Sequence, residues 1–145
     1  DVFTVTLPSE AEWEKAVRGL EGLIYPWGSE WRVDAANIDE TGLDTTSPVG
    51  IFPKGKSDAF GLLDGVGNVW EWTRSVWGED WGRPDFDYPY DPEDSARENL
   101  ESTQLRVVRG GSFNFIRNGA RCASRNWYNP VYGFNLIGFR LCLRP

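Results

Sequence analysis

The chain has 145 residues, of which 40% are hydrophobic and 26% charged, and a formal net charge of −7, which together exclude a disordered chain and predict one compact domain. No apolar run approaches the ~20 residues of a membrane span, and two cysteines are too few for a disulfide-stabilised scaffold. The absence of histidine excludes Ser-His and Cys-His nucleophiles and the usual zinc sites.

The first 60 residues are predicted to contain one strand and one helix. Residues 1–6 alternate as a short strand or an extended lead-in, and residues 9–18 have the signature of a helix. Ser9 is a suitable N-cap, Glu12 completes a capping box, and Gly19 ends the helix. The many turn formers of residues 20–60 predict a long coil, and something must hold such a coil in place inside a small domain.

The rest of the chain is predicted to alternate between short strands and ordered coil. Strands are expected at 69–73, 106–109, 120–124 and 138–143, and the acidic, Pro-rich residues 77–104 are expected to cross the surface. Short strands, one clear helix and much coil predict a single α+β domain over residues 1–145.

The charges are distributed unevenly along the chain. No Asp or Glu follows Glu101, and the arginines of residues 102–145 give that segment a net charge of +7, which leaves −14 for the first 101 residues. Arginines that bind nucleic-acid phosphates would give this pattern. We favour an intramolecular interpretation, in which the acidic part packs against the arginine-rich part through bidentate pairs, because the arginines are interspersed rather than clustered. No nucleic-acid partner is therefore expected.

A glycine-rich turn at residues 64–72 contains the first candidate site. Asp64 and Glu71 lie on either side of Gly65 and Gly67, so two carboxylates and the carbonyls between them can surround one hard cation such as calcium. The alternative is a tight turn whose carboxylates are solvated or paired with arginine. The spacing alone leaves both open.

Eight short motifs occur in an order that is typical of one family. They are Leu-Pro-Ser-Glu-Ala-Glu-Trp-Glu at 7–14, Tyr-Pro-Trp-Gly at 25–28, Ala-Asn-Ile at 36–38, Ser-Pro-Val at 47–49, Phe-Gly-Leu at 60–62, Gly-Asn-Val-Trp-Glu-Trp at 67–72, Arg-Val-Val-Arg-Gly-Gly-Ser at 106–112 and Gly-Phe-Arg at 138–140. In these motifs, from residue 7 to the C terminus, the chain resembles the formylglycine-generating enzyme (sulfatase-modifying factor) superfamily. The resemblance implies a C-type-lectin-like fold.

The resemblance also implies that the N-terminal part of the family domain lies outside this chain. The absence of methionine leads independently to the expectation that the chain is not a complete translation product. Because the helix and the sheet need a partner layer, we expect that N-terminal portion to remain associated.

Two calcium sites are implied by the same resemblance. The first is formed by two side chains and two backbone carbonyls, those of Asp64, Glu71, Gly67 and Val69. Part of the second is formed by the Asn37 side chain and the Ile38 carbonyl. Asp39 and Asp44 are further candidates, since the chain is short between Asn37 and Pro48.

The family's oxidase activity depends on two cysteines that bind copper in the segment after its Gly-Gly-Ser. Here residues 110–119 contain no cysteine, and copper(I) needs soft thiolate ligands. We expect Cys122 and Cys142 to be small buried residues, and whether they pair stays open. The sequence therefore predicts no copper and no catalytic residue.

Residues 113–136 are the second candidate site, because aromatic residues alternate there with Asn and Gly at no core period. Such a composition is typical of a recognition surface, and ordinary packing of a coil-rich domain is the alternative. The candidate ligand-binding residues are Phe113, Asn114, Phe115, Ile116, Asn118, Trp127, Tyr128, Val131, Tyr132, Phe134, Asn135 and Leu136.

A narrower resemblance favours a ligand-recognition surface over ordinary packing for residues 113–136. The chain is similar to variable proteins of diversity-generating retroelements, which end in such a segment a few residues after Gly-Phe-Arg and vary at adenines of an Asn-rich template. Trp127 would need a different starting codon. Eight residues can be reached from an Asn codon by changes in its first two bases: Phe115, Ile116, Tyr128, Val131, Tyr132, Gly133, Phe134 and Leu136.

The resulting prediction is a non-enzymatic module, braced by calcium, that binds a protein or cell-surface ligand through the variable segment 113–136. The alternatives are a divergent metal-dependent oxidase of the formylglycine-generating type and a structural or accessory subunit with the same fold.

Overall fold

The computed structural model describes residues 2–145, which form two sheets and one α-helix. In chain order the elements are β1 (Thr4–Thr6), α1 (Glu10–Arg18), β2 (Trp70–Gly78), β3 (Leu105–Arg109), β4 (Arg125–Tyr128), β5 (Ile137–Gly138) and β6 (Cys142–Arg144), with short 3-10 turns at Asp39–Thr41, Pro53–Gly55 and Ser95–Glu98. The larger sheet has the order β4-β3-β2-β5, with β5 parallel to β2, and β1 pairs antiparallel with β6.

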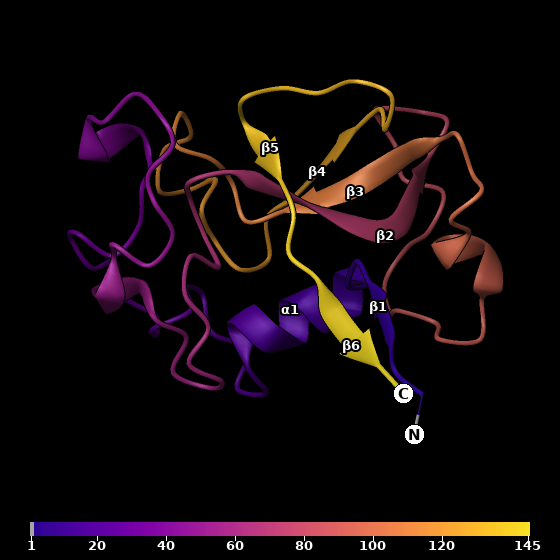
Figure 1. Cartoon of the computed structure of the whole chain (residues 1–145), viewed down its shortest axis with the longest axis horizontal. Coiled ribbons are helices and arrows are strands. Elements are labelled where there is room, and N and C mark those ends of the chain that lie inside the picture. The colour runs from indigo at the N-terminus through magenta and orange to yellow at the C-terminus, as the bar shows by residue number, and fades with distance from the viewer. Residues whose placement is uncertain (1) are drawn as a thin grey trace.

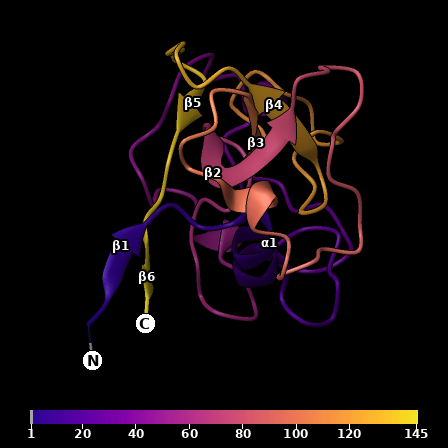
Figure 2. The ribbon, with the colours of Figure 1, turned by 90° about the vertical axis from the view of Figure 1, so that its right-hand side faces the viewer.

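The arrangement in space brings the two chain ends together. In Figure 1, α1 lies beneath the four-stranded sheet, and the connection between β4 and β5 arches over its top. The β1–β6 ribbon extends from the body of the molecule toward both termini (Figure 2). One end of the sheet therefore carries the β4–β5 connection, and the opposite side carries the helix and the ribbon.

The helix is confirmed as predicted. The Ser9 hydroxyl accepts from the Glu12 N–H at 3.1 Å, and the Glu12 carboxylate accepts from the Ser9 N–H at 2.7 Å, which completes the capping box. Trp13 and Val17 on its inner face are buried in the core. The long coil is confirmed as well, and the packed rings of Tyr25, Trp27 and Trp31 hold its first part.

Two of the predicted strands need correction. Residues 120–124 form turns, and the strand begins one residue later, at Arg125. Cys122 is buried in a turn rather than in a strand, and its carbonyl accepts from the Arg109 guanidinium at 2.7 Å. The single terminal strand expected at 138–143 is divided into β5 and β6, which belong to different sheets.

Ion pairs between the acidic and the basic parts confirm the intramolecular interpretation of the charges. Arg109 is fully buried and donates to Glu10 and to Glu14, each at 2.7 Å. Glu10 also pairs with Arg125, and further pairs join Arg140 to Glu71 and Arg144 to Glu12. Within residues 2–145 no helix has the length and apolar character required to cross a membrane.

Candidate functional site

The turn that precedes β2 positions the first candidate site. Asp64 and Asn68 both adopt positive φ, at 53° and 65°, and Gly67 between them has φ 78°. The Gly67 N–H donates to the Gly110 carbonyl at 2.8 Å, and a Cβ on Gly67 would collide with the Asn37 carbonyl oxygen. The turn is therefore fixed by its backbone, with only glycine tolerated at its closest approach.

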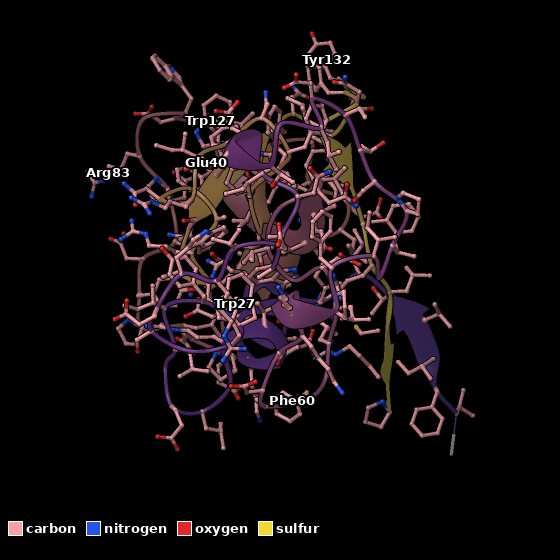
Figure 3. All side chains as sticks on the ribbon, turned by 90° about the vertical axis from the view of Figure 1, so that its left-hand side faces the viewer. Trp27, Glu40, Phe60, Arg83, Trp127 and Tyr132 are labelled. Carbon is pink, nitrogen blue, oxygen red and sulfur yellow. The ribbon has the colours of Figure 1, made fainter. Side chains whose placement is uncertain are left out.

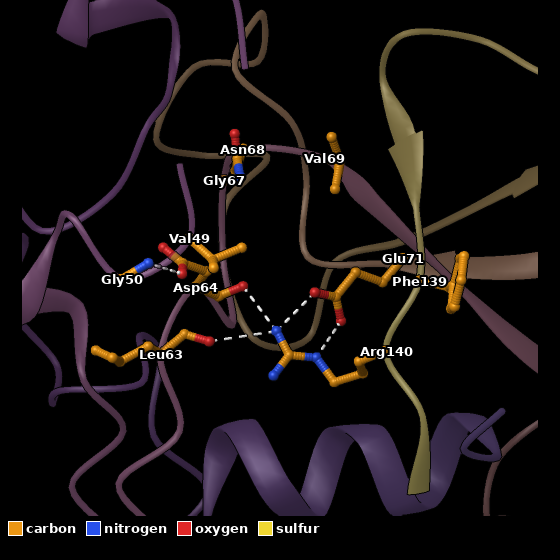
Figure 4. Close-up of a pocket in the computed structure, with 10 residues that line it drawn as sticks. All are labelled: Val49, Gly50, Leu63, Asp64, Gly67, Asn68, Val69, Glu71, Phe139 and Arg140. Carbon is orange, nitrogen blue, oxygen red and sulfur yellow. Dashed lines mark hydrogen bonds and ion pairs between the residues drawn. The ribbon is translucent and has the colours of Figure 1, made fainter. Parts of the chain in front are cut away.

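The structure brings the four predicted ligands of the first site together around one pocket of about 430 Å³. Asp64, Gly67, Val69 and Glu71 are among its lining residues, and Arg140, from the segment between β5 and β6, lies between Asp64 and Glu71 (Figure 4). The Asp64 carboxylate also accepts from the Gly50 N–H at 2.6 Å, so the pocket is tied to the coil as well.

Arg140 pairs with Glu71 inside this pocket. Its Nε and Nη2 donate to the two Glu71 oxygens, both at 2.6 Å, and Nη2 also donates to the Asp64 carbonyl at 3.0 Å. Trp13 Nε1 donates to the same carboxylate at 2.6 Å. Burial alone would lower the pKa of Arg140, but its hydrogen bonds and charge interaction with Glu71 raise it. The arginine pairing that the sequence left open as an alternative is therefore present.

The donor chemistry of the pocket fits a hard cation. The lining residues include two with carboxylates, which are ligands that suit calcium, and a guanidinium cation is already paired with one of these carboxylates. Across residues 2–145, no three His, Cys, Asp or Glu side chains are grouped closely enough to hold a metal. The backbone carbonyls would therefore have to complete the ligand set.

The second candidate cation site is less complete. Asn37 is buried and its Nδ2 donates to the Thr45 carbonyl at 2.9 Å, while its Oδ1 has no hydrogen-bond partner among the described residues. The Ile38 carbonyl accepts from the Thr41 N–H at 2.9 Å. Asp39 and Asp44 are exposed at the surface. The unsatisfied Asn37 oxygen is the feature of this region that fits an additional cation.

The predicted ligand-binding residues divide by exposure. Phe113 is only 8% exposed and its N–H donates to the Asn68 carbonyl at 3.0 Å, so its inclusion in a surface was wrong and it belongs to the core. The exposed members are Asn114, Ile116, Asn118, Val131, Tyr132, Phe134 and Asn135, and the half-buried members are Phe115, Trp127, Tyr128 and Leu136. Among the half-buried members, Phe115 packs edge-on against Trp70 at 5.2 Å.

Residues 129–136, called the recognition loop after the ligand-binding role that the sequence predicts for this segment, present an exposed apolar cluster. Val131, Tyr132 and Phe134 are 75%, 60% and 50% exposed. The Phe134 ring lies 5.6 Å from the Tyr128 ring and 6.4 Å from the Tyr132 ring. Within the loop, Asn129 accepts from the Val131 N–H at 3.0 Å and the Tyr132 N–H at 3.1 Å. The loop is therefore folded on itself while its apolar side chains face outward.

Trp127 and Tyr132 lie toward the same end of the molecule (Figure 3). Trp81, which is 71% exposed, packs edge-on against Trp127 with ring centres 6.3 Å apart. Sequence reasoning missed Trp81, although an aromatic residue in an acidic, Pro-rich excursion was a usable signal. It extends the candidate surface beyond residues 113–136.

Both cysteines are free thiols. Cys122 is buried, and this burial raises the pKa of its thiol to about 12, which keeps it protonated and unreactive near neutral pH. The pairing that the sequence left open is thus absent between the two cysteines. Cys122 has the character of a small core residue, as expected, whereas the expectation that Cys142 is buried was wrong, because it lies half-buried in β6.

Comparison with known proteins identifies the family. A family model described as the sulfatase-modifying factor enzyme 1-like domain matches residues 4–145. The chain belongs to this family. It is 32% identical to the formylglycine-generating enzyme of Mus musculus over 92% of this chain and 38% of that protein. It is 33% identical to the inactive C-alpha-formylglycine-generating enzyme 2 of Bos taurus over 92% of this chain and 42% of that protein.

The family fold is also that of a solved structure, Treponema denticola variable protein 1. The TM-score is 0.71 at 28% identity, over 97% of this chain and 48% of that chain. The chain thus spans about half or less of the length of these relatives. Because the family includes a formylglycine-generating enzyme, an inactive homologue and a variable protein, membership alone does not assign activity.

Proposed function

We propose that this member of the sulfatase-modifying factor family is a non-enzymatic binding module, and that its ligand-binding surface is the exposed part of residues 113–136. The observation that carries the proposal is the outward cluster of Val131, Tyr132 and Phe134 in the recognition loop. Exposed aromatic rings supply contact area at low conformational entropy cost, as in paratopes and interface hot spots. No charged residue lies between Arg125 and Arg140, so at the recognition loop a protein or cell-surface ligand would meet uncharged side chains.

Two observations support binding over oxidation. The segment 110–119 lacks the thiolates that copper(I) requires, and burial keeps Cys122 protonated. The structural similarity to a variable protein supports a segment that diversifies its ligand contacts. Sibling chains of this kind would then differ mainly at exposed positions of 113–136 and would keep Phe113 apolar.

A binding panel tests the proposal. The immobilised protein is assayed against purified bacterial and host cell-surface proteins, with a triple variant carrying Val131→Ser, Tyr132→Ser and Phe134→Ser. The control triple variant changes Val2, Leu20 and Val33 to serine, which are apolar residues exposed by 72% to 89% outside the segment. We expect the loop variant alone to lose the interaction of the wild-type chain. Equal binding by both variants would contradict the proposal.

We also propose that calcium braces the coil through Asp64, Glu71 and the carbonyls of Gly67 and Val69. When bound, the ion would supply a fixed positive centre for these oxygens. The unsatisfied Asn37 oxygen and the Ile38 carbonyl support a second position for the same cation. Association with an N-terminal portion of the family domain stays a prediction.

Thermal unfolding tests calcium binding. Addition of millimolar calcium to chelator-treated protein is expected to raise the unfolding midpoint, because a ligand that binds only the folded state stabilises it. Asp64→Asn should remove most of this increase, whereas Asp58→Asn, at an exposed residue outside the pocket, should keep it. An unchanged midpoint in the wild-type chain would contradict the proposal.

A further inference from the structure

We infer that Arg140 is the resident cation of the Asp64–Glu71 pocket and that a divalent cation competes with it for Glu71. The inference rests on the calcium site proposed above. It adds a regulatory role for Arg140, which is linked through β5 to the recognition loop.

The competition follows from how fully Glu71 is used. Arg140 donates to both carboxylate oxygens at 2.6 Å, and Trp13 takes a third acceptor position on Oε2. A calcium ion binds a carboxylate oxygen at ~2.3–2.6 Å. A metal ion and the guanidinium on the same carboxylate would therefore be separated by only a few ångströms, and two like charges at that distance repel strongly.

Burial makes this repulsion difficult to screen. The side chain of Glu71 is 8% exposed and that of Arg140 is 24% exposed. Arg140 also donates to the Asp64 carbonyl at 3.0 Å, so its guanidinium spans the two sides of the pocket (Figure 4). A cation that binds Glu71 would therefore compete with Arg140 for this carboxylate.

Displacement of Arg140 would affect how the recognition loop is anchored, because few residues separate the two. The Trp70 N–H donates to the carbonyl of Leu136, the last residue of the loop, at 2.7 Å. Gly138 of β5 lies opposite Glu71, and Arg140 follows two residues later. β5 has only two residues, and Arg140 anchors the chain beyond its C-terminal end through the pair with Glu71 and through its bonds to the Leu63 and Asp64 carbonyls. Cation binding and loop anchoring are therefore coupled, and linkage makes the coupling reciprocal.

Calorimetric titration of the protein with calcium chloride tests the inference. Arg140→Gln removes the competing charge and keeps polar character, so its calcium affinity is expected to rise at least about tenfold over wild type. The matched control is Arg144→Gln, which removes an arginine of β6 that pairs with Glu12 of α1 at 3.0 Å. This variant should leave the calcium affinity unchanged. Asp64→Asn should weaken binding in both the wild-type and the Arg140→Gln chains.

The outcomes separate this inference from the proposals on which it rests. An unchanged or lower affinity in Arg140→Gln, with Asp64→Asn still weakening binding, would overturn the competition and leave the calcium site standing. No binding in either chain would overturn both, without bearing on the recognition loop.

A second readout tests the coupling to the loop. In calcium-free protein, Arg140→Gln should speed hydrogen exchange of the Trp70 amide several-fold over wild type, because the variant loses the pair that holds the segment after β5 against Glu71. Equal or slower exchange would contradict the coupling.

Discussion

Arg109 shows how one residue joins the two oppositely charged parts of the chain. It lies on β3, is fully buried, and donates to Glu10 and Glu14 on α1. Its guanidinium also lies 5.1 Å from the centre of the Trp13 ring. The sequence predicted such pairs from the charge asymmetry, but the partner of each arginine depends on the tertiary fold, because Arg109 and Glu10 are 99 residues apart.

Replacement of Arg109 tests how much this ion-pair network stabilises the fold. Arg109→Met leaves buried Glu10 with only Arg125 and leaves the Cys122 carbonyl without its donor, so we expect the free energy of unfolding to fall by about 3–5 kcal/mol. Arg83→Met, at an exposed arginine, is the control and should change it by less than about 0.5 kcal/mol. Urea denaturation measures both variants, and similar losses of stability in the two would contradict the stabilising role of Arg109.

Glu14 predicts how stability depends on pH. Burial alone would raise its pKa, but the charges and hydrogen bonds of Arg109 and Arg18 outweigh this and lower the pKa below its usual value of 4.5. A carboxylate with a lowered folded-state pKa stabilises the protein above its unfolded-state pKa, and this contribution is lost as the pH falls through the folded-state value.

The measurement is urea unfolding at a series of pH values. We expect stability to fall between about pH 5 and about pH 3, and Glu14→Gln to make this fall shallower. Glu101→Gln, at an exposed residue, should leave the wild-type profile in place. A wild-type profile in Glu14→Gln would contradict the role of Glu14.

At the scale of elements, the sequence predicted correctly the element whose signals all lie within a few residues of one another. Capping residues and an apolar face specify α1 within ten residues, and the structure follows them. The strand expected at 120–124 was wrong because Cys122 is buried by tertiary packing in a turn, which local alternation cannot distinguish from a strand. The terminal strand was divided because Arg140 turns toward Glu71, a partner 69 residues away.

The candidate sites show the same difference between features that are local in sequence and contacts that only the tertiary fold makes. Asp64, Gly67, Val69 and Glu71 could be grouped from the sequence because one short turn brings them together. Arg140 was missed as their neighbour, because only the parallel pairing of β5 with β2 places it there. Phe113 was misassigned because an aromatic residue next to exposed residues has no local mark of burial.

The turn before β2 carries a prediction of its own. Gly67→Ala should reduce the free energy of unfolding by at least about 2 kcal/mol, because Gly67 has φ 78° and an added Cβ would meet the Asn37 carbonyl. Gly133→Ala, in the recognition loop with open space around the new methyl group, is the control and should stay within about 0.5 kcal/mol. Thermal or urea unfolding distinguishes them, and equal stability of the two variants would contradict the close approach at Gly67.

At the scale of the molecule, the framework and the proposed recognition surface use different residues. Ion pairs and the buried aromatic cluster join α1, the coil and the sheet. The connection between β4 and β5 lies at the other end, above the sheet (Figure 1). A module that varies its surface must tolerate substitution there without loss of the fold, and this separation allows it.

The stability of the triple loop variant tests this separation most directly. With Val131, Tyr132 and Phe134 all changed to serine, we expect the free energy of unfolding to stay within about 1 kcal/mol of wild type, because all three side chains are at least half exposed. Urea denaturation of the folded wild-type and variant chains provides the comparison. A loss of several kcal/mol would show that these residues form part of the core, and the recognition surface proposed for this chain would be wrong.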